Sequence, residues 1–290
     1  MDGRPWISSE IKKIFNCFML NEKMTENPSQ IVIGVINSRC KCYAGHLHSR
    51  YSPSNGYADN FDRLERFPGR MKTAAGWNDL SGKPRPGKSW LDGLPRTIFV
   101  SDMGDSFAGD VDYQYLKTEV VDHALSEKGS RHIWLWLTKR PTRMAAFSDW
   151  IQDAGLNWPD NLVAMTTVTS SLTINRVQQL QRVRCRHRGL SVEPLWGQVE
   201  LPLEGIDWVI VGGESGTEAR AFDLEWARSL RVQCERVETA FFVKQLGANP
   251  IDGGTVVNLS DRHGGNWDEW PEDLRIRQMP NSFRLIGGAP

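Results

Sequence analysis

The feature that most constrains the fold is a set of six short apolar runs separated by stretches with helical periodicity. The runs are continuous rather than alternating and are rich in β-branched and aromatic residues, as is typical of strands buried on both faces. They occur at residues 97–101, 132–138, 162–168, 188–192, 207–212 and 239–243. The pattern predicts an α/β fold built on a parallel sheet wound with helices.

The segments between these runs show the 3.6-residue period of amphipathic helices. The spacing predicts helices over 112–127, 141–152, 172–184 and 222–237. In the third segment, Leu172, Val177, Leu180 and Val183 fall on one apolar face. The link between the fourth and fifth runs, LWGQVELPLEGI, lacks this period, so no helix is expected there.

The number of runs and the chain length favour a TIM-barrel-like (β/α) parallel barrel, complete or partial. The six runs and a candidate strand at 31–36 approach the eight of a full barrel, and 290 residues lie close to the ~250 typical of one. An open doubly wound sheet is the alternative, which periodicity does not separate from a barrel. We expect a loop-rich segment over 1–95 that belongs to the barrel domain, a barrel core over 96–248 and a tail over 249–290, with Trp267 and Trp270 packed on the barrel.

Composition limits the class of protein. Lys and Arg total 35 and Asp and Glu total 35, which argues against nucleic-acid binding by bulk charge but not against a local basic groove. No apolar run reaches the ~18 residues of a membrane span, and the first twenty residues lack the apolar core of a signal peptide. We expect a cytoplasmic protein that does not enter a membrane.

Polar residues follow every predicted strand. Because the carboxyl ends of parallel strands meet at one edge of the sheet, these residues form the candidate binding site. We expect Glu193, Glu214, Lys139 and Lys244 to line one cavity with Cys40 and Cys42 at its rim, and Gly212-Gly213 to leave room beside Glu214. Mutual ion pairing of the four charges is the simpler alternative. The strand-end residues are Asp102, Asp105, Lys139, Arg140, Thr166, Thr167, Thr169, Glu193, Gly212, Gly213, Glu214, Ser215, Lys244 and Gln245.

A second concentration of reactive side chains is CKCYAGHLH at residues 40–48. Cys40, Cys42, His46 and His48 are ligand types for zinc or an iron–sulfur cluster, although their spacing matches no common metal motif. The sequence has no P-loop, zinc-protease or serine-hydrolase motif.

Several blocks of the chain resemble a phage- and bacteria-associated family of unknown function that is treated as radical-SAM-like. The resemblance covers roughly residues 40–280 and is most distinctive in SVEPL and IDWVIVGGESG. The matching blocks are PRTIFVSDMGD, WLWLTKRPTRM, NLVAMTTVTS, GLSVEPLWG, IDWVIVGGESG, AFFVKQLG and WPEDLRIRQMP.

The resemblance implies a partial or complete (β/α) barrel, a [4Fe–4S] cluster held by three cysteines, and S-adenosylmethionine on the open iron. Cys40 and Cys42 would be cluster ligands, and Lys139, Arg140, Lys244 and Asp102 would meet the substrate, with the three basic residues at an anionic group of it. The residues that would line the cofactor are Glu193, Gly212, Gly213, Glu214 and Ser215.

The cysteine block departs from the family pattern. One residue separates Cys40 from Cys42 where the family has two, and Val32 stands near the place of the first cysteine. Either the cluster is absent, or Cys17 folds back as third ligand, or residues 1–39 replace the family's N-terminus.

Three functional hypotheses follow. The first is a radical-SAM-type enzyme acting on an unknown, nucleic-acid-related substrate. The second is a non-catalytic barrel that has lost the cluster and binds a nucleotide or nucleic acid through its basic residues. The third, ranked last, is a zinc-stabilised hydrolase that uses His46 or His48.

Overall fold

The structure, a computed structural model, describes residues 65–101, 104–109 and 111–286. The chain divides into two units, of which the second comprises residues 67–101 with 105–290. All helices and strands discussed here belong to the second unit. The candidate strand at 31–36 lies outside the described residues, as do Cys17, Cys40, Cys42, His46, His48 and Asp102.

Six parallel strands form the main sheet, and all six predicted strands are confirmed. Five of the runs are buried on nearly every residue, and so on both faces of the sheet, whereas in the first run Thr97 and Phe99 are half-buried. Their sequence order is also their spatial order, and every pairing is parallel. The strands are β1 (Thr97–Val100), β2 (Ile133–Thr138), β3 (Leu162–Thr167), β4 (Arg188–Val192), β5 (Trp208–Gly212) and β7 (Ala240–Gln245).

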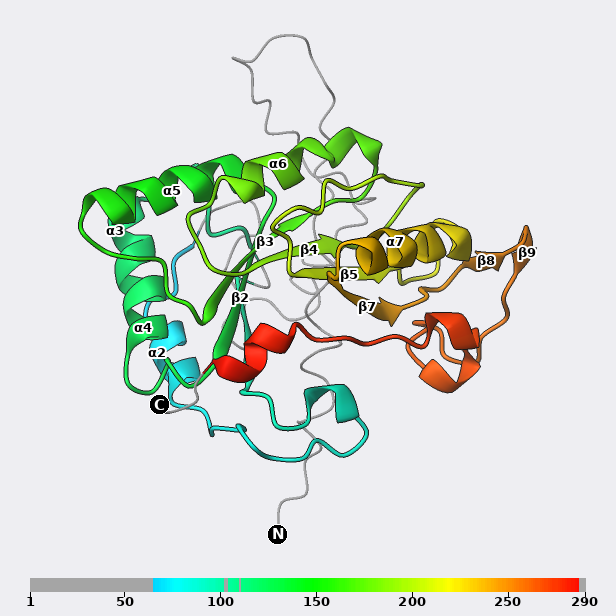
Figure 1. Cartoon of the computed structure of the whole chain (residues 1–290), viewed down its shortest axis with the longest axis horizontal. Coiled ribbons are helices and arrows are strands. Elements are labelled where there is room, and N and C mark those ends of the chain that lie inside the picture. Colours follow the sequence, from blue (N-terminus) through cyan, green and yellow to red (C-terminus); the bar gives the residue numbers. More distant parts are fainter. Residues whose placement is uncertain (1–64, 102–103, 110, 287–290) are drawn as a thin grey trace. The chain divides into compact units, whose positions relative to one another are not determined.

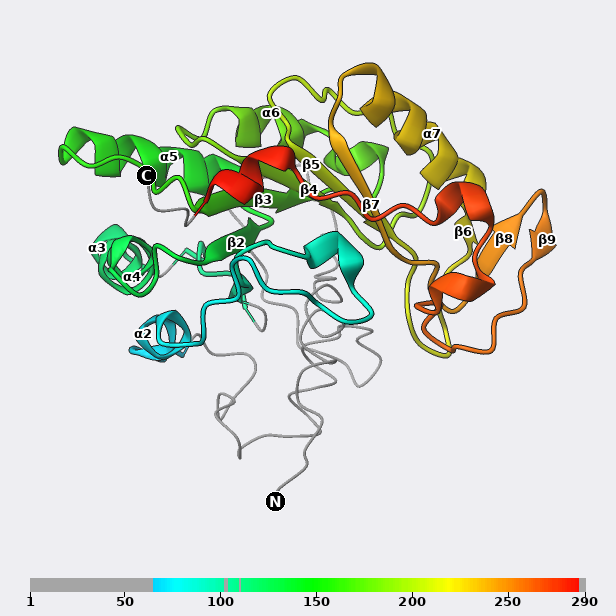
Figure 2. The same ribbon diagram turned by 60° about the horizontal axis from the view of Figure 1, so that its bottom comes forward.

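The strand order separates the two architectures that the sequence left open. A doubly wound sheet reverses its strand order at a switch point, whereas this sheet runs β1-β2-β3-β4-β5-β7 without reversal. Its strands curl beneath the helices as part of a barrel wall does (Figure 2). The fold is therefore a partial (β/α) barrel, as predicted.

Helices follow most of the strands and cover one face of the sheet (Figure 1). A helix made of α3 (Tyr113–Leu116), a π-helical segment (Lys117–Val121) and α4 (Asp122–Leu125) connects β1 to β2. Helices α5 (Pro141–Asp153), α6 (Asn175–Gln181) and α7 (Leu224–Arg236) follow β2, β3 and β5. The β4–β5 link has no helix, as its sequence predicts.

The predicted helix over 172–184 is too long at both ends. The chain first forms a 3-10 turn over Ser171–Thr173, in which Ser170 and Thr173 make a reciprocal capping box, and α6 begins only at Asn175. Leu172 therefore lies outside the apolar face of α6 and is 83% exposed. The prediction that placed it on that face is wrong, because side-chain caps overrode the periodicity.

Alternate residues of each strand point to opposite faces of the sheet. Val209 and Val211 of β5 belong to the apolar core beneath the helices. Trp208, Ile210 and Gly212 consequently face the other, inner side. Because Gly212 has no side chain, it leaves space on this inner side of the sheet.

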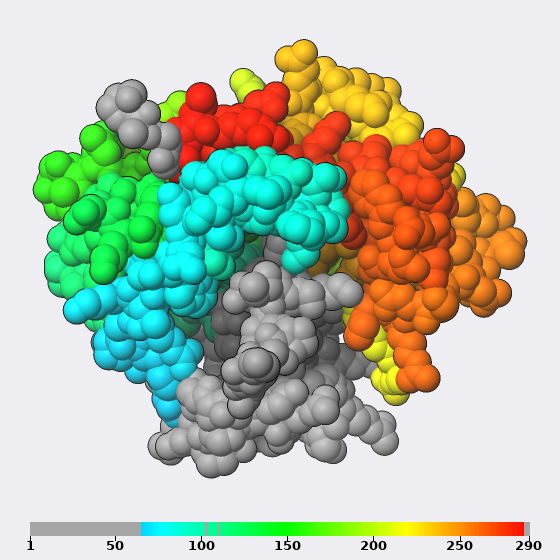
Figure 3. Space-filling view, turned by 90° about the horizontal axis from the view of Figure 1, so that it is seen from below, coloured from blue at the N-terminus to red at the C-terminus, as the bar shows by residue number. Residues whose placement is uncertain are grey.

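The segment before β1 and the C-terminal segment pack against each other (Figure 3). Trp90, in the 3-10 turn Ser89–Leu91, stacks on Trp267 with ring centroids 6.1 Å apart, and Arg284 donates to the carbonyl of Asp92 over 3.1 Å. Trp270 is buried and joins the main core. The smaller elements are α2 (Arg70–Ala75), β6 (Phe222–Asp223), β8 (Pro250–Asp252), β9 (Thr255–Val256) and 3-10 turns at Trp267–Glu269, Glu272–Leu274 and Asn281–Leu285.

Candidate functional site

A buried ion pair lies at the carboxyl ends of the strands. Glu193 directly follows β4, and Lys244 is the fifth residue of β7. The Lys244 Nζ atom lies 3.3 Å from Glu193 Oε2, and the two side chains are only 6% and 1% exposed. The fold thus brings together two charged residues that the sequence singled out, although 51 positions separate them.

Gly212 makes this contact possible. Strand β5 lies between β4 and β7, so a side chain at the end of β5 would stand between the two charged groups. A Cβ atom at Gly212 would lie 2.3 Å from Glu193 Oε1, closer than any real contact. The space that we expected beside Glu214 is therefore filled, at Gly212, by the carboxylate of Glu193.

Burial dominates the electrostatics of the pair. It raises the pKa of Glu193 from 4.5 to about 7, and the nearby Lys244 ammonium opposes the rise. Burial likewise lowers the pKa of Lys244, against the effect of the Glu193 carboxylate. Glu193 Oε1 is buried and has no hydrogen-bond partner among the described residues. A buried carboxylate oxygen without a donor is costly unless a ligand or a proton satisfies it.

Gly213, Glu214 and Ser215 form a second group on the rim. Gly213 leaves space for the backbone of Leu246, which a Cβ atom would approach to 2.3 Å. Both Glu214 carboxylate oxygens accept hydrogen bonds from the Arg220 guanidinium, at 2.8 and 3.0 Å. Ser215 Oγ accepts from Gln245 Nε2 over 2.9 Å. Glu214 is therefore paired with Arg220, which lies outside the predicted set of four charged residues.

Lys139 and Arg140 belong to a third group, organised by the buried Asp105. Its Oδ2 atom accepts from the backbone N–H of Lys139 and from Arg140 Nη1, at 3.1 and 2.9 Å. Its Oδ1 atom accepts from Thr138 Oγ1 over 2.8 Å. Asp105 thus ties the loop after β1 to the end of β2, and it holds Arg140 at the carboxyl rim with 44% of that side chain exposed.

The sequence did not single out Arg220 or Trp196, which complete the rim. The Arg220 guanidinium lies 3.8 Å from the centre of the Trp196 ring, a cation–π contact, while it also pairs with Glu214. No motif marks these residues, since Arg220 lies in the irregular segment between β5 and β6. Only the position of Trp196, three residues after Glu193, could have indicated from the sequence that its ring lies at the rim.

Ser101, at the carboxyl end of β1, has a φ of 64°, in the left-handed region that a residue with a side chain seldom adopts. Such strain costs of order 1–3 kcal/mol and clusters at binding sites. Ser101 lies at the same end of the sheet as the Glu193–Lys244 pair.

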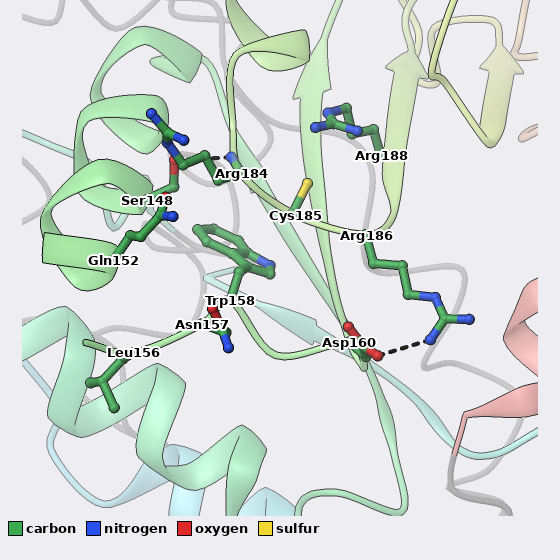
Figure 4. Close-up of a pocket in the computed structure, with 10 residues that line it drawn as sticks. All are labelled: Ser148, Gln152, Leu156, Asn157, Trp158, Asp160, Arg184, Cys185, Arg186 and Arg188. Carbon is green, nitrogen blue, oxygen red and sulfur yellow. Dashed lines mark hydrogen bonds and ion pairs between the residues drawn. The ribbon is translucent and has the colours of Figure 1, made fainter. Parts of the chain in front are cut away.

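A cavity of about 300 Å³ lies at the opposite, amino ends of β3 and β4 (Figure 4). Two of its arginines are paired with carboxylates: Arg186 with Asp160 at 2.8 Å, and Arg184 with Asp149 at 2.6 Å. The amino-terminal face of a barrel serves stability rather than catalysis. We therefore place the candidate site at the carboxyl ends.

Two further properties bear on function. Among residues 65–101, 104–109 and 111–286, no three His, Cys, Asp or Glu side chains are arranged to hold a metal ion. No helix in this part of the chain has the length and apolar character needed to cross a bilayer.

The fold and the site define a partial (β/α) barrel with a buried charge pair at the carboxyl ends of its strands. The chain belongs to the family described as "Protein of unknown function (DUF5131)", whose model matches residues 24–271. No curated protein and no solved structure matches the chain.

Proposed function

We propose that the protein binds S-adenosylmethionine at the carboxyl ends of its strands and is an iron–sulfur enzyme of the radical type. The supporting observation is Glu193 Oε1, a buried carboxylate oxygen without a donor on the inner side of a partial barrel. The methionine part of S-adenosylmethionine carries an amino group that would donate to this atom and a carboxylate that suits Lys244. Its two charged groups thus match the two charges of the pair.

The cluster would be held by Cys40 and Cys42, with Cys17 as the third thiolate, all of which lie outside the described residues. A reduced cluster would supply the electron for reductive cleavage of S-adenosylmethionine. The part assigned to the described residues is to bind the methionine group through Glu193 and Lys244 and to keep that end of the barrel dry. Gly212 contributes by leaving the carboxylate its space.

The test is anaerobic reconstitution with iron and sulfide, followed by quantitation of both. A stoichiometry near four irons per chain, lost in Cys40→Ser and Cys42→Ser, supports the cluster. Iron and sulfide at background level would overturn the enzymatic hypothesis.

Binding is tested separately by equilibrium dialysis of S-adenosylmethionine. We expect Glu193→Gln to weaken binding at least tenfold, since it removes the charge that the amino group meets. The matched control is Glu204→Gln, on the exposed surface of the β4–β5 link. Equal affinity of wild type and Glu193→Gln would show that the pair is not the binding site.

A second candidate function is binding of a nucleotide or nucleic acid without catalysis. The observation that favours it is the pair of guanidinium groups on the carboxyl rim, Arg140 and Arg220, which are 44% and 36% exposed. Such groups match phosphate geometry. This function predicts that cluster-free protein binds an oligonucleotide, and that the affinity decreases with added salt and in Arg140→Gln. Absence of such binding at low salt would exclude it.

A further inference from the structure

The C-terminal segment runs along the outer edge of β7. The Val243 N–H donates to the carbonyl of Ile276 over 2.8 Å, and the Gln278 N–H donates to the carbonyl of Phe241 over 3.0 Å. Phe242 and Arg277 face each other in this antiparallel bridge. Residues 276–278 are thus hydrogen-bonded to β7, the strand that carries Lys244.

Arg277 continues this pairing with its side chain. Its Nε atom donates to the carbonyl of Val243 over 3.2 Å, and its Nη2 atom donates to the carbonyl of Lys244 over 3.1 Å. The planar guanidinium therefore holds two successive carbonyls at the end of β7. One of them belongs to the residue whose ammonium meets Glu193.

Four aromatic rings fix the guanidinium in this place. Its central carbon lies 4.5 Å from the ring centre of Trp90, 4.9 Å from Trp270, 5.2 Å from Trp267 and 5.8 Å from Phe242. Among the described residues, no carboxylate lies within ion-pair distance of Arg277. Ring faces and carbonyl dipoles therefore balance its charge, and burial lowers its pKa to about 10.

We propose that Arg277 is a positioning residue that holds the Lys244 ammonium at the Glu193 carboxylate. Without the guanidinium fork, two carbonyls at the end of β7 lose their donors, and the backbone of Lys244 is free to shift. A small displacement matters because the Nζ–Oε2 contact is already 3.3 Å long. The inference rests on the proposed function only in treating this pair as the ligand site.

The test measures the pKa of Glu193 without any ligand, by carbon-13 NMR titration of protein labelled at the glutamate carboxyl carbons. The Glu193 signal is assigned as the one missing from Glu193→Gln. In Arg277→Lys and Arg277→Met we expect the pKa of Glu193 to rise by about one pH unit, a tenfold change in proton affinity, because the ammonium moves away from it. Lysine keeps the positive charge but loses the two-pronged fork.

The matched control is Arg275→Gln. Arg275 lies in the same segment and also donates to two carbonyls, those of Trp270 and Asp268, but to none of β7. We expect it to leave the pKa of Glu193 unchanged. Should the Arg277 variants not fold, Trp267→Leu removes one ring from around the guanidinium, and we expect a smaller rise in the same direction.

Two other outcomes overturn the proposal. A lower melting temperature with an unchanged pKa of Glu193 makes Arg277 only a structural anchor. A rise in Arg277→Met but not in Arg277→Lys makes its charge, rather than its fork, the cause. Failure of the wild type to bind S-adenosylmethionine would overturn the proposed function and leave this result standing.

Discussion

Replacing Glu193 by glutamine should change how stability depends on pH. In the folded protein, burial raises the pKa of Glu193 from 4.5 to about 7. The folded state therefore holds this proton more tightly than the unfolded state does. A rise of this size corresponds to about 3 kcal/mol of folding free energy. Stability fully present below about pH 4.5 should be lost as the pH rises to about 7, and Glu193→Gln should lack this loss.

The assay is urea unfolding of the wild type and Glu193→Gln at several pH values between 4.5 and 8. Subtracting one free energy of unfolding from the other at each pH cancels the shared groups that lie away from Glu193. The difference reports the coupled titration of Glu193 and Lys244. We expect the wild type to lose about 3 kcal/mol relative to the variant across this interval. Glu204→Gln, whose side chain is exposed, should give a flat difference.

The opposite slope would refute the reasoning. If the wild type gained stability relative to Glu193→Gln as the pH rose, attraction to Lys244 would outweigh desolvation. The carboxyl would then titrate below 4.5 in the folded protein. A flat difference would mean that the two effects cancel, and Glu193 would not be a strained group awaiting a ligand.

Three further substitutions test contacts at the site and elsewhere in the fold. Gly212→Ala should cost about 2–4 kcal/mol in urea unfolding, because its Cβ atom would lie 2.3 Å from Glu193 Oε1, whereas Gly197→Ala, with open space around it, should change stability by less than about 0.5 kcal/mol. Trp270→Ala should cost about 3–5 kcal/mol by the same measurement, since its buried indole also donates to the carbonyl of Gly264. Arg228→Met should move acid unfolding, followed by circular dichroism, to higher pH, because this guanidinium lowers the pKa of its two aspartate partners. Equal stability of Gly212→Ala and Gly197→Ala, a stable Trp270→Ala, or an unmoved acid transition would each contradict the contact on which it depends.

The sheet was predictable because its signal is local. Continuous apolar runs such as that of β5 can be buried only between two layers, and the helical period between them left a parallel sheet as the simplest arrangement. The choice between a barrel and an open sheet depends on strand order. That order is set by packing between distant segments, which no window of sequence contains.

The site was predictable in its residues but less so in its partners. Glu193 and Lys244 were singled out because each was expected just past a strand, and parallel strands carry such residues to one edge. Which charge meets which depends on the residue between them. Gly212 stands between β4 and β7 and leaves room for the contact between Glu193 and Lys244. Glu214 instead binds the guanidinium of Arg220, six residues further along the chain. Glycine in a sequence shows that space is left, not which group fills it.

Strand β7 is both the last strand of the open sheet and the strand that carries Lys244 of the charge pair. A closed barrel needs a further strand on that edge, but residues 276–278 and the side chain of Arg277 already occupy the backbone groups of Phe241, Val243 and Lys244 there. An unpaired edge would also be a liability for association with other chains. The C-terminal segment therefore ends the sheet, and it does so at the residue whose side chain meets Glu193. Any change that loosens the segment should displace β7 and, with it, the Lys244 ammonium. The pKa of Glu193 therefore reports both the attachment of the segment and the geometry of the charge pair.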